Sequence, residues 1–153
     1  MATRSSGFSL IELLVVVVIL GVLGTIGVLT YKGYISSTER KSAENLIRQI
    51  ALGQTEYYSE NQDYFTNSGG STCEPSVKFS EDIQTDLLNG SEIIIDGSTN
   101  PKKAHTGFLM CVTPEAGKFK ITAQKQLQGK AGVDKQGCKI EITASNKITR
   151  TNC

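Results

Sequence analysis

An uninterrupted apolar run near the N-terminus constrains this chain more than any other feature of its sequence. From Phe8 to Leu29 the residues read FSLIELLVVVVILGVLGTIGVL, and Glu12 is the one charged residue among them. As a helix with a rise of 1.5 Å per residue, this run would be about 33 Å long, which matches the hydrocarbon core of a bilayer. We therefore predict a membrane-spanning helix over residues 8–29.

Glu12 decides between three interpretations of this run. A secretory signal peptide would have a shorter apolar region and a small-residue cleavage site after it, and no such site follows residue 29. A simple uncleaved anchor leaves the carboxylate unexplained, because an ionised acid in the apolar layer costs on the order of a few kcal/mol unless it is paired. Cleavage between Gly7 and Phe8 explains it, since the new α-amine of Phe8, in this chain or a neighbour, can neutralise Glu12 one helical turn away.

The residues around this bond resemble the N-terminus of type IV pilins. That family has a short basic leader, a Gly before the cleavage site, a Phe that becomes N-methylated and a Glu four residues later, which are here Gly7, Phe8 and Glu12. The resemblance implies a leader peptide at residues 1–7, cleavage and N-methylation by a prepilin peptidase, and an assembly salt bridge made by Glu12. One departure is Leu29, where many pilins have a proline near the end of this helix.

The helical pattern continues beyond the apolar run, but with apolar residues on one face only. They recur at the spacing of an amphipathic helix, at Ala43, Leu46/Ile47, Ile50/Ala51 and Tyr57/Tyr58. We therefore predict one long helix over residues 8–58, whose second half packs on a sheet. The following stretch is rich in Asn, Asp, Gly and Pro and is predicted as a loop.

Strands are predicted in the second half of the chain, where polar and apolar residues alternate. The predicted strands cover residues 107–112, 118–124, 138–143 and 146–150, with a short helix at 81–90 and a short strand at 91–96 before them. The expected fold class is α+β: a long N-terminal helix packed on a three- to four-stranded antiparallel β-sheet, which is the pilin fold that the resemblance implies. Residues 30–153 would form the extracytoplasmic head domain.

Four cysteines, at positions 73, 111, 138 and 153, predict two disulfides rather than a metal site. No two of them form a CxxC pair, and the chain has a single His. An even number of cysteines after a membrane segment fits an oxidising compartment. Four cysteines allow three connectivities. The resemblance to the disulfide-bounded C-terminal loop of type IV pilins implies that Cys138 pairs with Cys153, which leaves Cys73 and Cys111 for each other.

We find no sequence motif of a catalytic, cofactor or metal site, so we predict that the chain is not an enzyme and needs no cofactor. His105 lies in a polar stretch and is predicted to be a solvated loop residue. The net charge of +1, with 16 basic and 15 acidic residues, argues against a dedicated nucleic-acid partner. Scattered surface lysines are the favoured interpretation, but six remain candidate DNA contacts: Lys102, Lys103, Lys118, Lys120, Lys130 and Lys135.

The function implied by the resemblance is that of a type IV pilin precursor, a structural subunit of a surface filament used for adhesion, twitching motility or DNA uptake. The expected partners are other copies of the chain and related pilins, the prepilin peptidase and the inner-membrane assembly platform. The chain would be a single-pass inner-membrane protein before assembly and part of an extracellular pilus afterwards. The alternatives are a type II secretion pseudopilin, a DNA-binding minor pilin and, most remotely, a membrane-anchored enzyme.

Overall fold

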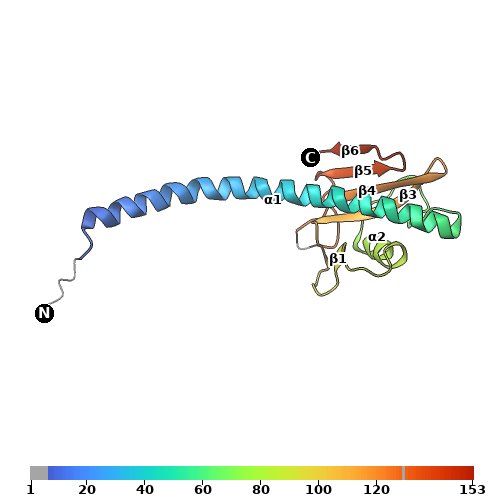
Figure 1. Ribbon diagram of the computed structural model, residues 1–153, viewed down its shortest axis with the longest axis horizontal. Coiled ribbons are helices and arrows are strands. Elements are labelled where there is room, and N and C mark those ends of the chain that lie inside the picture. The colour runs from blue at the N-terminus through green and yellow to red at the C-terminus, as the bar shows by residue number, and fades with distance from the viewer. Residues whose placement is uncertain (1–6, 129) are drawn as a thin grey trace. The chain divides into compact units, whose positions relative to one another are not determined.

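The computed structural model describes residues 7–128 and 130–153, except for the side chains of residues 27–30 and 32. Two compact units divide the chain between residues 38 and 39, and each is described by itself below. Most of the predicted leader, residues 1–6, and the side chain of Leu29 lie outside the described residues. Helix α1 has the bounds Leu10–Asn61 (Figure 1), so the predicted long helix is confirmed with small shifts at both ends.

In the first unit, α1 presents apolar side chains on all of its sides. From residue 8 to residue 26 the large apolar residues are at least 49 % exposed in the single chain, with Val15 the least exposed and Phe8 the most, at 84 %. A helix that is apolar all round suits an environment without water, either a bilayer or the interior of a helix bundle.

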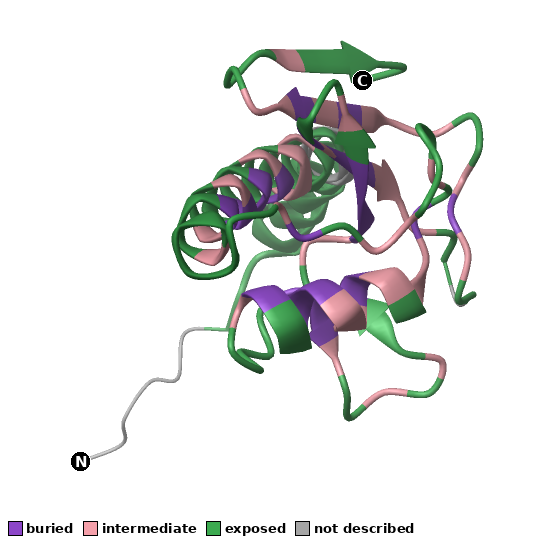
Figure 2. Cartoon of the chain, turned by 90° about the vertical axis from the view of Figure 1, so that its right-hand side faces the viewer, coloured by how far each residue is buried: buried purple, intermediate pink, exposed green. Residues whose placement is uncertain are grey.

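In the second unit, α1 buries one face only. Ala43, Ile47 and Ile50 are completely buried, whereas Leu52 on another face is 71 % exposed. The buried face packs into one hydrophobic core with residues of the sheet, among them Ile121, and Figure 2 shows the purple residues on the side of the helix that faces the strands. The amphipathic pattern of the sequence is thus realised by packing of helix on sheet.

The main sheet is a four-stranded antiparallel meander in the order β3-β4-β5-β6. Its strands are β3 Phe108–Glu115, β4 Lys118–Lys125, β5 Lys139–Thr143 and β6 Ile148–Thr151. Ala116 and Gly117 both have positive φ and make the two-residue turn between β3 and β4. All four strands predicted from the alternation are confirmed, although β3 continues through Pro114 to Glu115.

The segment before the sheet differs in detail from the prediction. Helix α2 spans Val77–Asp82 and is followed by a π-helical turn, η1, over Ile83–Leu87, so helical structure begins four residues earlier than predicted. The predicted strand at 91–96 shrinks to β1, Ile95–Asp96, which pairs with β2, Lys103–Ala104. The reason is Gln84, a buried side chain whose Oε1 accepts hydrogen bonds from the amides of Ile94 and Ile95 at 3.1 and 3.0 Å, where a longer strand would need a backbone partner.

Candidate functional site

The predicted cleavage bond, Gly7–Phe8, precedes the first residue of α1 and has no helical structure. Gly7 is exposed, and a Cβ placed on it would meet no described atom within 4 Å. Phe8 and Leu10 are 84 % and 83 % exposed. Packing against the described residues therefore gives no reason for a glycine at position 7, and an exposed bond outside the helix is accessible to a peptidase.

Glu12 lies in the first turn of α1 and caps the helix. Its Oε2 accepts a hydrogen bond from the backbone N–H of Ser9 at 3.0 Å, while the amides of Glu12 and Leu13 donate to the carbonyl oxygen of Ser9. This is the reach-back contact of a capping box, in which the fourth residue of an S-x-x-E motif satisfies a free amide at the helix start. The sequence does contain this motif, as Ser9-Leu10-Ile11-Glu12, but the sequence analysis considered only an amine as the partner of Glu12.

The cap also orients the carboxylate for the predicted assembly contact. Of the two carboxylate oxygens of Glu12, only Oε2 has a hydrogen-bond partner among the described residues. Oε1 is therefore available to another donor. It lies at the N-terminal end of a helix, where a negative charge is favourable. Cleavage of the Gly7–Phe8 bond would turn the backbone nitrogen of Phe8 into a free amine, four residues before Glu12 in the sequence.

Comparison with known protein families bears on this N-terminal site. Residues 2–28 match the family described as the prokaryotic N-terminal methylation motif. The chain carries the prepilin signature. No curated protein and no solved structure matches the chain. The prepilin signature is shared by type IV pilin and pseudopilin precursors, and it covers the predicted cleavage site, Glu12 and most of the apolar run.

The apolar part of this prepilin signature was also predicted to span a membrane. Among the residues that the structure describes, no helix combines the length and the mean hydropathy required to cross a bilayer. The end of the predicted span, residues 27–29, has side chains outside the described residues.

The cysteines of the head form two disulfides, Cys73–Cys111 and Cys138–Cys153. Cys111 is fully buried in β3, so its disulfide ties the loop after α1 to the middle of this edge strand. Cys153 is exposed and its disulfide ties the chain after β6 to the residue before β5. Of the three connectivities that the sequence allowed, the structure has the one that the pilin resemblance implied.

Two arginines reinforce the attachment of β6, and sequence reasoning missed both. Arg150 on β6 donates to Glu44 on α1 with two hydrogen bonds, Nε–Oε1 at 2.5 Å and Nη2–Oε2 at 2.9 Å. Arg40 donates to the main-chain oxygen of Cys153 at 2.7 Å. The hydrogen bond from Arg150 holds the pKa of Glu44 below its ordinary value, and the same pair raises the pKa of Arg150. These contacts could not be predicted from the sequence because the partners are 106 and 113 positions apart.

The candidate DNA-contact lysines are divided among several elements of the head, and half of them are paired. Lys102, Lys120 and Lys135 form ion pairs with Glu81, Glu115 and Glu74. Lys103 lies on β2, Lys118 begins β4, and Lys130 is in the loop after β4. The paired carboxylates lower the positive charge that a stripe of these lysines would present to phosphates.

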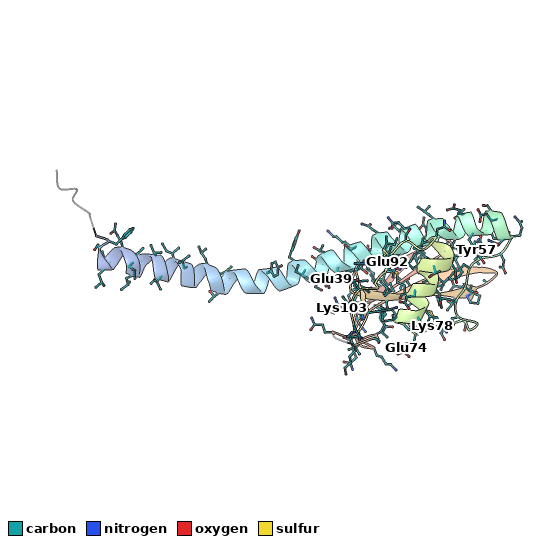
Figure 3. The ribbon with its side chains drawn as sticks, turned by 90° about the horizontal axis from the view of Figure 1, so that it is seen from below. Glu39, Tyr57, Glu74, Lys78, Glu92 and Lys103 are labelled. Atoms are coloured by element: carbon teal, nitrogen blue, oxygen red, sulfur yellow. A yellow bond between two sulfur atoms is a disulfide. The ribbon has the colours of Figure 1, made fainter. Side chains whose placement is uncertain are left out.

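The surface of the head has several open pockets. The first, of about 390 Å³, is lined by residues of α1, the loop after it, β4 and the end of β5 with its following turn, including Leu52, Tyr64 and Phe119. The second, of about 400 Å³, includes Glu39 and Lys103, both labelled in Figure 3, together with His105 and Lys125. Lys125 is ion-paired with Glu39. Within the described ranges no group of three His, Cys, Asp or Glu residues could hold a metal ion.

The aromatic residues at the end of α1 serve packing. Tyr57 meets Phe65 edge to face, with ring centroids 5.8 Å apart, and Tyr58 stacks on Tyr64 at 4.6 Å. Tyr64 in turn packs against Phe119 of β4. These contacts join the loop after the helix to the sheet.

Proposed function

We propose that the chain is the precursor of a structural subunit of a type IV pilus. The match of residues 2–28 to the N-terminal methylation motif carries this proposal. A prepilin peptidase would cleave the Gly7–Phe8 bond and methylate the amine of Phe8. The mature chain would be held in the inner membrane by residues 8–29 and then enter a surface filament made of copies of itself and related pilins.

The geometry of the N-terminal site supports this processing step. The bond to be cut lies outside the helix, and α1 begins only two residues after Phe8. The capping contact of Glu12 with the Ser9 amide fixes where the helix begins. Glu12 therefore has two tasks in the proposal: it keeps the helix from extending over the cleavage bond, and it binds the Phe8 amine of a neighbouring subunit during assembly.

The head supports a pilin in preference to a pseudopilin. Its last strand is fastened by the Cys138–Cys153 disulfide and by Arg40 and Arg150, which makes a closed, stapled tail. Such a tail resists unfolding and suits a subunit exposed outside the cell. The exposed apolar side chains of α1 in the first unit provide a surface that packing of many helices would bury.

The test is the N-terminus and intact mass of the protein from its native cells, measured separately in the cell envelope and in sheared surface material. The expected product is a chain that begins with N-methylated Phe8 and is abundant in the sheared fraction. The same product confined to the envelope would point to a pseudopilin. A chain that keeps Met1 in both fractions would contradict the proposal.

A pair of glycine variants separates recognition of the cleavage site from general damage to the helix. Gly7→Val should leave the leader attached, whereas Gly33→Val should be cleaved normally. Neither glycine has a described atom within 4 Å of an added Cβ, so both substitutions fit sterically. Equal cleavage of the two variants would remove Gly7 from the proposed site.

A further inference from the structure

The two edges of the main sheet are treated differently by the rest of the head. At β3, Asn67 pairs with Val112: the backbone N–H of Asn67 donates to the Val112 carbonyl at 3.2 Å, and its side-chain Oδ1 accepts from the backbone N–H of Val112 at 2.9 Å. Ser80 of α2 does the same for Met110, with its Oγ accepting from the Met110 amide at 2.9 Å. The edge of β3 is therefore covered at Met110 and Val112, whose backbone groups have partners.

Among the residues that the structure describes, none covers the edge of β6 in this way. Thr143 N donates to the carbonyl oxygen of Lys147, which makes 143 and 147 a hydrogen-bonded pair. Because such pairs alternate along antiparallel strands, Thr149 and Thr151 direct their backbone groups toward β5, and Ile148 and Arg150 direct theirs outward. Among the described residues, no partner exists for these outward N–H and C=O groups.

We propose that the free edge of β6 pairs with the same edge of a second copy of this chain, antiparallel and centred on Thr149. In that register Ile148 of one copy lies opposite Arg150 of the other, and each of these two pairs exchanges two backbone hydrogen bonds. Thr149 lies opposite Thr149 of the second copy, a cross-strand pair that is favourable in sheets. The whole of β6, Ile148–Thr151, is used.

Charge favours this register over the one centred on Arg150. Centring the pair on Arg150 would place two guanidinium groups opposite each other, and like charges in that position are destabilising. Centring on Thr149 places Arg150 opposite an isoleucine and Lys147 opposite Thr151. Arg150 is also neutralised within its own copy, because both of its hydrogen bonds go to the carboxylate of Glu44.

The edge is held in place before any partner arrives. The Cys138–Cys153 disulfide fixes the chain just beyond β6, and Arg40 binds the Cys153 main chain. Asn146 and Asn152, both with positive φ, turn the chain at either end of the strand, so the edge is short and has defined ends. An edge that is already ordered loses little conformational entropy on pairing.

The resulting contact has two-fold symmetry and closes after two copies. It joins heads in pairs and does not propagate as a fibre. The inference rests on the head alone and stands whether or not the proposed pilus function is correct.

A cysteine placed at the centre of the pair tests the register in the full-length chain. Thr149→Cys would put two thiols across a pair of residues with Cα atoms about 4.5 Å apart, which a disulfide can bridge. Thr151→Cys is the matched control: like Thr149 it is exposed, but its two copies would lie about 14 Å apart. After mild oxidation we expect at least about tenfold more disulfide-linked dimer from Thr149→Cys, because the control distance is too long to bridge.

A proline tests whether the outward amide at position 150 is used. Arg150→Pro and Arg150→Ala both lose the contact with Glu44, but only the proline also removes the N–H. In the Thr149→Cys background the proline variant should give much less dimer than the alanine variant. Equal dimer yields from the 149 and 151 cysteines, or from the proline and alanine variants, would overturn the proposal.

The unsubstituted protein provides a readout that does not depend on variants folding. In the full chain in detergent micelles, the amides of Ile148 and Arg150 should exchange with solvent more slowly as protein concentration rises, as measured by NMR. The amide of exposed Ser145, in the β5–β6 turn, should not change. Exchange at 148 and 150 that is fast and independent of concentration would rule out the pairing.

Discussion

The two ends of helix α1 illustrate how differently one element can use apolar residues. Between residues 10 and 26 they occupy every side of the helix and are exposed in the single chain, whereas between residues 43 and 50 they occupy one side and are buried against the sheet. The first pattern has no direction and gains nothing until lipid or other helices surround it. The second pattern has a direction and determines where the sheet lies.

This comparison predicts that substitutions of equal kind will have unequal effects on the head. Ile50→Ala, at a completely buried position, should lower the free energy of unfolding of the head by about 2–5 kcal/mol, because it removes buried methyl groups and leaves a cavity. Val16→Ala, in the exposed part of α1, should leave the unfolding of the head unchanged. Denaturant unfolding of the full chain in detergent, followed by tyrosine near-UV circular dichroism, measures both.

A large loss of head stability in the Val16 variant would contradict the comparison, since it would show that the apolar half of α1 stabilises the head directly. A neutral result for Ile50→Ala would show that the buried face of α1 can be truncated without leaving a cavity.

The disulfide of the tail should matter only to the head. Replacing Cys138 and Cys153 together by alanine opens a loop with a sequence separation of 15 and should cost about 3 kcal/mol of unfolding free energy. The helical signal of residues 10–26 should stay the same, as NMR chemical shifts would report. A change there would mean that the tail influences the start of the helix.

Glu12 should have the opposite distribution of effects. Glu12→Ala removes the acceptor of the Ser9 amide and a negative charge at the helix start, which is expected to cost about 0.3–1 kcal/mol of local helix stability. The helix should then begin later than Leu10, seen as faster exchange of the first amides, with the head unaffected. Glu12→Gln keeps an oxygen acceptor and should retain the start of the helix, but it should fail in the proposed assembly contact.

The pair between Glu44 and Arg150 should give the smallest effect and a distinctive pH dependence. The pKa of Glu44 lies below its ordinary value of 4.5 because of the hydrogen bond from Arg150. The ionised carboxylate therefore stabilises the head above pH 4.5, and this contribution is lost as the pH falls through the lowered pKa. Glu44→Gln should lower the Tm of the head by no more than a few degrees at neutral pH.

Thermal unfolding of both proteins from pH 7 downward measures this dependence, and the difference between their Tm values should narrow as the pH falls through the lowered pKa of Glu44. A Tm difference that stays unchanged down to the lowest pH at which the head still folds would show that the charge of Glu44 is not the source of the effect. Lys41→Gln changes a charged residue of α1 outside the pair and serves as the control.

Much of the fold was readable in the sequence because its signals are local. The period of the apolar residues predicted α1, and the alternation in FKITA and KIEIT predicted β4 and β5. The prediction was wrong in detail around residues 77–96. There Gln84, ten and eleven positions from Ile94 and Ile95, replaces backbone partners with a side-chain amide, and a long-range substitution of this kind leaves no periodic trace.

The candidate site divides along the same line. Gly7, Phe8 and Glu12 were found from the sequence because they lie within six residues of one another and form a recognisable motif. The capping partner of Glu12 was missed although the S-x-x-E spacing was present, since the carboxylate was interpreted only through its charge. The contacts of Arg40 and Arg150 were missed because nothing in the sequence relates them to Cys153 and Glu44.

The sequence by itself determined the prepilin-like N-terminus, the amphipathic half of α1, the period of the strands and the number of disulfide-forming cysteines, because each depends on neighbours within a few residues. The tertiary structure decided which cysteines pair, which arginines fasten the tail, and which edge of the sheet is covered. Asn67 and Ser80 meet β3 across 45 and 30 positions, and no corresponding side chain reaches β6 among the described residues. Such contacts depend on where the whole chain brings its segments together, which short-range pattern does not encode.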